Sequence, residues 1–367
     1  MLYDANGVVD DYVNVLLSSL KNEIQEMLIV VNGRMNYKLL EGLHKYGDEI
    51  FCRDNMGFDA GAYKDVFLNF LPRYKRGEYD EIVLMNDTFF GPMFPLKPFF
   101  GRLETETVDF WGITRHPEKK TSDGRIIKSH VQAYFLVIRR RLSMSTSFED
   151  FWRELAYPQS YQEAVRNFEI RFTTYFEARG FRGVSWMDLH EGVSWETQEE
   201  NPYLLHGYEL IKDLQVPFLK KKCLGFENRG YINALEALEY IEEESQYDTG
   251  LIWGNLFRLC REKLFPSILD YDSLEHFYSR HRRIYIYGAG GYGQRMARYF
   301  QYRKWTFECF LVSGFEDEGY NCRKYGGTDF GADDGIVLAL GKEAFDEVYP
   351  VVMEALDPGQ LFLLRYG

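Results

Sequence analysis

The chain has 367 residues, of which 46% are apolar and 27% are charged, and its formal net charge is −13. This length is enough for two domains, and the composition is typical of a folded protein. The negative charge argues against nonspecific binding to nucleic acid or to an anionic membrane. It does not argue against a nucleotide ligand, which needs only a local basic pocket.

The cysteines and the amino terminus indicate the compartment. The five cysteines, Cys52, Cys223, Cys260, Cys309 and Cys322, form no C-x-x-C pair. This favours a reducing cytoplasm over a disulfide framework or a zinc site. The amino terminus lacks the basic and apolar regions of a signal peptide, and no apolar run is long enough to span a bilayer. We therefore expect a cytoplasmic protein, peripheral at the inner face of the membrane if it docks on membrane-associated machinery.

The first fifty residues alternate between short apolar strands and amphipathic helices. Strands are predicted at residues 1–4, 27–31 and 49–52, with helices from about residue 8 and around residues 38–46. This alternation is the signature of βαβ units on a parallel sheet. Asp4, Asn32 and Arg53 follow the strands and are expected to line one edge of that sheet. For Asn32, which precedes a glycine, turn chemistry is the alternative explanation.

The loop after the third strand is punctuated by glycines. Gly57 and Gly61 bracket Asp59, so that backbone and carboxylate can approach a ligand closely. Apolar residues then repeat at helical spacing over residues 63–71, and Pro72 marks the end of the helix.

A buried strand follows at residues 81–85, and its carboxyl end delivers Asn86 and Asp87. Ligands of open α/β sheets bind at the carboxyl ends of strands. Two acidic positions at neighbouring strand ends, Asp59 and Asp87, therefore predict a polar-ligand or metal site.

The pattern R-x-N-x-G-x-D-x-G-A-x-K, followed by N-D-x-x-x-G-P, resembles the rhamnan synthesis protein F family of bacterial glycosyltransferases. Its positions are Arg53, Asn55, Gly57, Asp59, Gly61, Ala62, Lys64, Asn86, Asp87, Gly91 and Pro92. The resemblance covers roughly residues 1–228. It implies an α/β fold of the GT-A type, a mixed-sheet nucleotide-diphospho-sugar transferase domain. It also implies transfer of rhamnose from dTDP-rhamnose to a cell-surface polysaccharide or lipid-linked glycan acceptor.

The resemblance and the demands of this reaction assign roles to the same residues. Expected donor contacts are Asp4, Arg53, Asn55, Gly57, Asp59, Gly61, Lys64 and Asn86. Asp87 is the expected ligand of Mg²⁺ or Mn²⁺, since a divalent cation stabilises the departing diphosphate.

After Pro92 the pattern predicts strands at residues 109–113 and 131–138, with a polar loop at 116–130 over the site. The segment SHVQAYFLV resembles the family's H-x-Q-S-Y-F motif, with alanine where serine is usual. Its polar residues alternate, so they would share one face of a strand and bind a hydroxyl-rich acceptor. These residues are His130, Gln132 and Tyr134. A structural histidine is the alternative for the first of them.

Residues 164–180 read as a helix that ends at Gly180, with Glu169 near its start. Glu169 lies eleven residues before this glycine, as the catalytic base does in family 2 glycosyltransferases, so it resembles the base of an inverting enzyme. Phe168 stands where those enzymes carry a first acid. The alternative is a surface glutamate paired with Arg166 or Arg171.

Residues 216–222 resemble the P-F-x-K element that closes the family's transferase domain. Lys220 and Lys221 would neutralise a diphosphate leaving group, or they are solvated lysines on a surface turn.

Residues 229–280 read as a helical linker, and residues 281–367 as a Rossmann-like domain. There a strand leads into Gly288, Gly290 and Gly293, a G-x-G-x-x-G pattern before a helix. The second strand ends in Ser313 rather than the acid that binds a ribose, so NAD(P) is not expected. A second nucleotide site and a docking or oligomerisation module both remain open. For the whole chain, the alternatives to a transferase are a non-catalytic scaffold of a polysaccharide assembly complex and a nucleotide-sugar oxidoreductase that uses these glycines.

Overall fold

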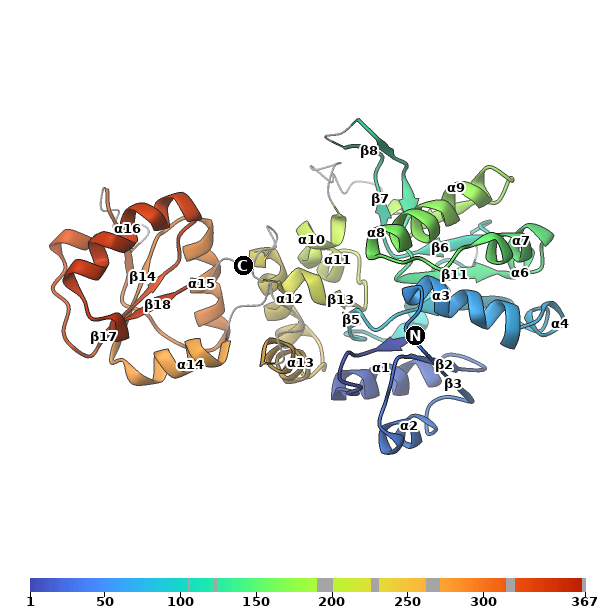
Figure 1. The fold of residues 1–367 in the computed structure, drawn as a ribbon, viewed down its shortest axis with the longest axis horizontal. Coiled ribbons are helices and arrows are strands. Elements are labelled where there is room, and N and C mark those ends of the chain that lie inside the picture. Colours follow the sequence, from blue (N-terminus) through green and yellow to red (C-terminus); the bar gives the residue numbers. More distant parts are fainter. Residues whose placement is uncertain are drawn as a thin grey trace. The chain divides into compact units, whose positions relative to one another are not determined.

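The computed structural model describes residues 1–104, 106–121, 124–189, 201–225, 231–261, 271–314 and 321–364. The chain divides into two compact units. The first comprises Met1–Cys223 and Tyr240–Leu251, and the second comprises Leu224–Glu239 and Ile252–Gly367. Each has its own sheets (Figure 1). The domain borders at residues 228 and 280 stay a prediction.

The first unit begins with a three-stranded parallel sheet, as the alternating pattern predicts. Its strands are β1 (Leu2–Tyr3), β2 (Leu28–Asn32) and β3 (Glu49–Arg53), in the order β1-β2-β3. Two helices connect them, α1 (Asp11–Lys21) and α2 (Tyr37–Leu43). The first of these buries the stripe Val13, Leu16, Leu17 and Leu20.

A second sheet of four strands has mixed direction. In spatial order the strands are β12 (Gly183–Ser185), β6 (Phe110–Gly112), β11 (Phe135–Arg139) and β4 (Glu81–Met85). Strand β11 is antiparallel to both neighbours, whereas β12 is parallel to β6. The backbone nitrogen of Met1 donates to the carbonyl oxygen of Met85 at 2.8 Å, so β1 lies beside the carboxyl end of β4.

Two helical segments pack on this sheet through an aromatic core. The first segment is α3 (Phe58–Asp65), which continues as a π-helix over Val66–Phe70. The second segment begins with α8 (Tyr161–Ala164), continues as a π-helix over Val165–Ile170 and ends with α9 (Arg171–Glu177). Helix α7 (Thr146–Glu154) packs with them. The shared core contains Phe67, Phe148, Phe151, Trp152, Phe168, Phe172 and Phe176. The helices predicted at 63–71 and 164–180 therefore exist, and each includes a π-helical segment that the periodicity did not predict.

The single strand predicted at residues 131–138 is wrong. Instead β10 (His130–Val131) pairs with β7 (Arg115–His116), and a turn at residues 132–134 separates it from β11. Within the polar excursion, β8 (Lys119–Lys120) pairs with β9 (Ile126–Ile127), so this segment contains a two-stranded sheet.

The remaining elements of the first unit are short. They are α4 (Arg73–Arg76), β5 (Phe89–Phe90), α5 (Leu96–Gly101), α6 (Arg140–Ser143), α10 (Pro202–Leu205), α11 (Gly207–Lys212) and β13 (Leu219–Lys220), with 3₁₀ turns at Met187–Leu189 and Lys221–Leu224. Strand β13 pairs with β5, which carries the lysines at its end to the region after β4.

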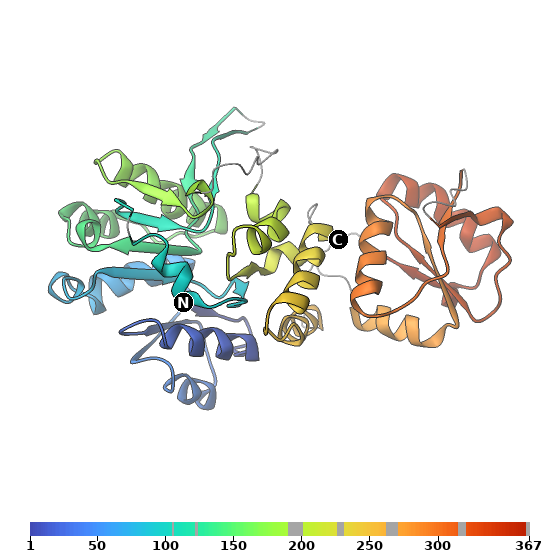
Figure 2. The same ribbon diagram turned by 180° about the vertical axis from the view of Figure 1, so that it is seen from behind.

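Helices α12 (Tyr231–Glu244), α13 (Gly250–Arg261) and α14 (Tyr271–Arg280) precede the sheet of the second unit. Its five strands are all parallel, in the order β16 (Cys322–Lys324), β15 (Phe310–Val312), β14 (Arg283–Tyr287), β17 (Asp334–Leu338), β18 (Leu361–Leu363). Helices α15 (Gly291–Tyr302) and α16 (Lys342–Ala355) lie on opposite sides of this sheet (Figures 1 and 2). Cover on both faces explains why β14 and β17 are almost wholly buried.

Candidate functional site

The carboxyl ends of β1 and β4 meet in the first unit. Besides the bond between Met1 and Met85, the backbone nitrogen of Tyr3 lies 3.4 Å from Oδ2 of Asp87. Since β1 also pairs with β2, the strand ends predicted to share one edge do so.

Asp87 lies next to Lys221. The Tyr12 hydroxyl donates to the backbone oxygen of Asp87 at 3.1 Å, and Nζ of Lys221 donates to that hydroxyl. Burial raises the pKa of Asp87, and the positive charge of Lys221 partly offsets this rise. The structure therefore brings together one expected metal ligand and one expected diphosphate contact.

Asp59 faces the same strand end from the first turn of α3. Nδ2 of Asn86 donates to Oδ2 of Asp59 at 3.2 Å, and burial raises the pKa of this carboxyl. One turn later, the hydroxyl of Tyr63 is buried and has no hydrogen-bond partner among the described residues. Burial and the negative charges of Asp59 and Asp87 raise the pKa of Tyr63 well above its ordinary value.

Tyr63 is a further residue of this cluster, and the sequence pattern predicts it only as part of the apolar stripe of its helix. Its spacing of four residues from Asp59 was the available signal, since residues i and i+4 share one face of a helix.

Arg53 stabilises its own loop. Its guanidinium donates to Asp65 at 2.7 Å, to Oδ1 of Asn32 at 2.8 Å and to the backbone oxygen of Met56 at 2.6 Å. Nδ2 of Asn32 in turn donates to Asn55 at 3.1 Å. The side chain of Arg53 is only 6% exposed. These predicted donor contacts therefore hold the loop between β3 and α3 in shape.

The two glycines of this loop are required by the chain itself. Gly57 has a left-handed backbone with φ of +79°, and a Cβ on Gly61 would lie 2.2 Å from the backbone oxygen of Met56. The close approach that their spacing predicts is made to protein backbone.

Asp4 and Lys64 bind groups outside this cluster. The carboxylate of Asp4 accepts the backbone N–H groups of Asn6 at 2.9 Å and Val8 at 3.1 Å, which closes the turn after β1. Nζ of Lys64 donates to the backbone oxygen of Leu155, beyond the end of α7. The lysine of the motif is thus bound to the end of a helix.

Glu169 lies in the π-helical segment and is held by the turn at residues 132–134. Its Oε2 accepts the backbone N–H of Ala133 at 2.9 Å, and its Oε1 lies 3.4 Å from Nε2 of His130. Burial alone would raise the pKa of Glu169, but the hydrogen bond of His130 and the charge of Lys220 bring it below its usual value. Arg171 instead pairs with Glu154, at 2.6 Å.

The other two expected acceptor residues form one buried chain of hydrogen bonds. Oγ1 of Thr114 donates to Oε1 of Gln132 at 2.7 Å and lies 2.8 Å from the Tyr134 hydroxyl. A hydroxyl has one proton, so Tyr134 is the donor in the second bond. Thr114 is fully buried and was not singled out by any sequence pattern.

Lys220 links these two groups of residues. Its Nζ lies 4.0 Å from the centre of the Tyr134 ring. Burial lowers the pKa of Lys220 to about 8, against the negative charges of Glu169 and Asp59. A lysine from β13 therefore acts electrostatically on both Glu169 and Asp59.

The G-x-G-x-x-G pattern of the second unit follows β14 and opens α15. Gly288 has φ of +104°, and a Cβ on Gly293 would lie 1.7 Å from the backbone oxygen of Gly288. A Cβ on Gly290 would meet nothing within 4 Å. The hydroxyl of Tyr287 lies 2.9 Å from that of Ser313, at the end of the second strand.

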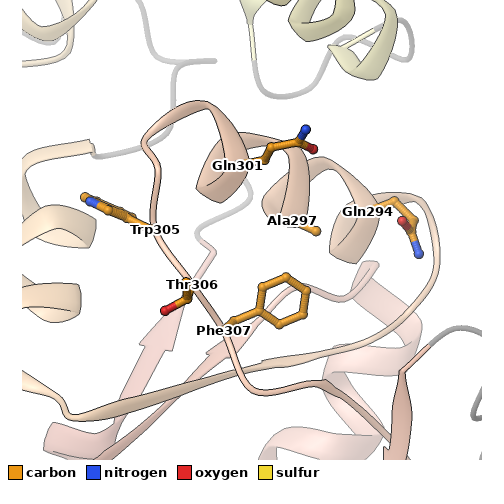
Figure 3. Close-up of a pocket in the computed structure, with 6 residues that line it drawn as sticks. All are labelled: Gln294, Ala297, Gln301, Trp305, Thr306 and Phe307. Atoms are coloured by element: carbon orange, nitrogen blue, oxygen red, sulfur yellow. The ribbon is translucent and has the colours of Figure 1, made fainter.

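A separate hollow of about 480 Å³ lies between α15 and the segment that follows it. Figure 3 shows Gln294, Ala297 and Gln301 projecting from successive turns of this helix, with Phe307 facing them. Its lining has no ionisable side chain, and it contains none of the residues described above. The hollow therefore offers no group for acid–base chemistry.

A comparison with known protein families assigns the chain to one of them. The family model described as rhamnan synthesis protein F matches residues 27–287, well over half of the chain. The chain belongs to the rhamnan synthesis protein F family. The match continues past residue 228, where the motif resemblance was expected to end, and reaches β14 of the second unit.

The chain is also similar to the uncharacterized protein y4gN of Sinorhizobium fredii (strain NBRC 101917 / NGR234). The two are 26% identical over 189 residues, which is 48% of this chain and 46% of the relative. The matched region thus spans about half the length of that relative. No solved structure matches the chain. Within the described residues, no helix is both long enough and apolar enough to cross a membrane.

Proposed function

We propose that the chain is a glycosyltransferase that moves a sugar from a nucleotide-diphospho-sugar to a saccharide acceptor during polysaccharide synthesis. The carrying observation is that Glu169 is held by Ala133 N–H at 2.9 Å and shares an electrostatic environment with Asp59 and Lys220. This arrangement supports a single site with a base for the acceptor and residues for the donor. Family membership supports dTDP-rhamnose as the donor and a cell-surface polysaccharide or lipid-linked glycan as the acceptor.

In the proposed reaction, Glu169 takes the proton of the acceptor hydroxyl as its oxygen attacks the anomeric carbon. The bond between that carbon and the diphosphate breaks, and its electron pair leaves with the diphosphate. Direct displacement inverts the anomeric configuration. Lys220 and Lys221 would face the leaving charge.

The residues at the end of β4 fit a divalent cation. Asp87 is a partly buried carboxyl with a raised pKa, and the Tyr63 hydroxyl near it lacks a partner among the described residues. The described residues contain no cluster of three or more His, Cys, Asp or Glu side chains. A cation on Asp87 would therefore take further ligands from the diphosphate and from water. When bound, it would neutralise charge on the leaving group.

We propose that the first unit has the GT-A fold and the second a Rossmann-like fold. When the strands of the second unit are numbered along the chain from β14, their spatial order is 3-2-1-4-5. This is the order of doubly wound nucleotide-binding sheets. Ser313 in place of a ribose-binding acid supports a docking role, or a nucleotide site other than that of an NAD(P) oxidoreductase.

The transferase proposal is tested by separating donor binding from transfer. A thermal-shift panel of dTDP- and UDP-sugars, with and without Mg²⁺ or Mn²⁺, identifies the donor. Glu169→Gln is expected to keep the thermal shift and to lower transfer by a factor of 10² or more, of the order expected for a lost general base. Asp87→Ala is expected to lose the metal-dependent shift.

Unchanged polymer synthesis in both variants would contradict the transferase and leave the scaffold alternative. A shift with NAD(P) alone, lost in Gly290→Ala, would favour the oxidoreductase.

A further inference from the structure

Glu169 and His130 form a close pair whose two members differ in solvent access. The side chain of His130 is 2% exposed, whereas that of Glu169 is 20% exposed. A substrate in the site can therefore reach the carboxylate, while the imidazole lies behind it. This differs from the predicted role of His130 as an acceptor contact.

Both imidazole nitrogens of His130 face oxygen atoms. Nδ1 lies 2.7 Å from the backbone oxygen of Lys128, which can only accept, so Nδ1 carries a proton. Nε2 lies 3.4 Å from Oε1 of Glu169. If Nε2 and the carboxylate both lacked a proton, two lone pairs would face each other. One proton must therefore lie between them.

The orientation of this imidazole is fixed from several sides. Its ring stacks on that of His116, with planes 7° apart and centres 5.2 Å apart. The neighbouring backbone nitrogen of Val131 donates to Oγ1 of Thr173 at 3.0 Å. A rotation of the ring that turned Nε2 away from the carboxylate would also take Nδ1 away from the backbone oxygen of Lys128.

The surrounding charges decide where the shared proton resides. Lys220 from β13 favours the carboxylate form of Glu169, and Asp59 from α3 opposes it. His116 from β7 is partly buried, and this burial lowers its pKa and favours its neutral form at pH 7. With the cation of Lys220 nearby, the carboxylate is the favoured form of Glu169, so the shared proton resides on Nε2 of His130.

We propose that His130 is the positioning residue of the general base: it shares a proton with Glu169, orients the carboxylate and holds it in the ionised form that accepts the acceptor's proton. The resting pair then contains one shared proton. During transfer the acceptor O–H bond breaks, its proton binds Glu169, and the acceptor oxygen uses the freed electron pair to bond the anomeric carbon. The pair then contains two protons, and its added positive charge balances the diphosphate that leaves.

This inference rests on the proposed transferase function, but its first test needs no substrate. In protein with ¹⁵N-labelled histidine, both ring nitrogens of His130 are expected to show imidazolium shifts at pH 7. His130→Gln identifies the resonances. In Glu169→Gln the same ring is expected to become neutral, because the amide carries no negative charge to stabilise an imidazolium. A neutral ring in the unchanged protein, or an unchanged ring in Glu169→Gln, would overturn the pair.

The second test is the pH profile of transfer. His130→Gln removes the cation that lowers the pKa of Glu169. The acidic limb of kcat should therefore move to higher pH, with the acceptor KM changed less than twofold. His116→Phe is the matched control, since it keeps a ring against His130 and removes the other histidine of the stack. The acidic limb of kcat should not move in this variant.

A rise in acceptor KM with an unmoved limb would instead make His130 an acceptor contact. The two tests also separate the two proposals. Loss of the transferase function would leave the NMR result standing, and failure of the NMR result would leave the transferase untouched.

Discussion

The guanidinium of Arg53 stabilises its loop whether or not a nucleotide is bound. Arg53→Ala would leave Asp65 and Asn32 without this donor, so we expect the free energy of unfolding to fall by about 3 kcal/mol. Denaturant unfolding measures this loss. Arg153→Ala is the control, because the ion pairs of Arg153 are exposed and should contribute less than about 1 kcal/mol. Equal stabilities of the two variants would show that Arg53 has no such role.

At the same scale, the lowered pKa of Lys220 predicts that donor binding depends on pH. Because the pKa of Lys220 is about 8, its amine is neutral in a large share of the free protein molecules at pH 8. A bound diphosphate favours the ammonium form, so the pKa rises and a fraction of a proton is taken up on binding. Calorimetry of dTDP binding at pH 8, in buffers of different ionisation enthalpy, measures this uptake.

Lys220→Arg should abolish the uptake, because arginine stays charged at this pH. Lys222→Arg, on the adjacent turn, should leave it intact. Binding without proton uptake in the unchanged protein would remove Lys220 from the proposed diphosphate site.

At the scale of elements, the turn from β14 into α15 contains one glycine that packing requires, Gly293, and one that packing does not require, Gly290. Gly293→Ala places a methyl 1.7 Å from the backbone oxygen of Gly288, so strand and helix must move apart. We expect a loss of about 3 kcal/mol in the stability of the second unit. Gly290→Ala meets nothing and has ordinary backbone angles, so it should change stability by less than about 0.5 kcal/mol.

Urea unfolding of the two variants provides the comparison. Since Gly290→Ala leaves the fold intact, any ligand affinity that it removes belongs to a nucleotide at this turn. A Gly290→Ala variant as unstable as Gly293→Ala would contradict the geometry.

At the scale of the molecule, each unit buries a core of its own. The first core centres on aromatic residues such as Phe151, and the second on residues of the parallel sheet such as Tyr285 and Ile336. Calorimetry of the full chain should therefore resolve two transitions. Phe151→Ala should lower only one of them, by about 3–5 kcal/mol, because it empties a fully buried site. Gly293→Ala should lower only the other. A single transition that both variants shift equally would mean that the units unfold together.

Local pattern predicted most of the elements because the residues that form them are neighbours in sequence. The apolar run of β4 was placed at its observed bounds, and the G-x-G-x-x-G turn was placed between a strand and a helix. The break at residues 132–134 could not be predicted, because Ala133 gives its N–H to Glu169, 36 residues further along the chain. Lys64 likewise binds Leu155, 91 residues away, which no local pattern contains.

The sequence by itself determined the βαβ pattern, the family motif and the residue types of the proposed transferase site, since spacing along the chain carries each of them. Only the tertiary structure decided which of those residues meet. It separated Asp59, Asp87, Glu169 and Lys220, which act on one another or on shared neighbours, from Arg53 and Asp4, which hold loops. The reason is physical: electrostatic effects and hydrogen bonds depend on distance through space, and the fold sets that distance.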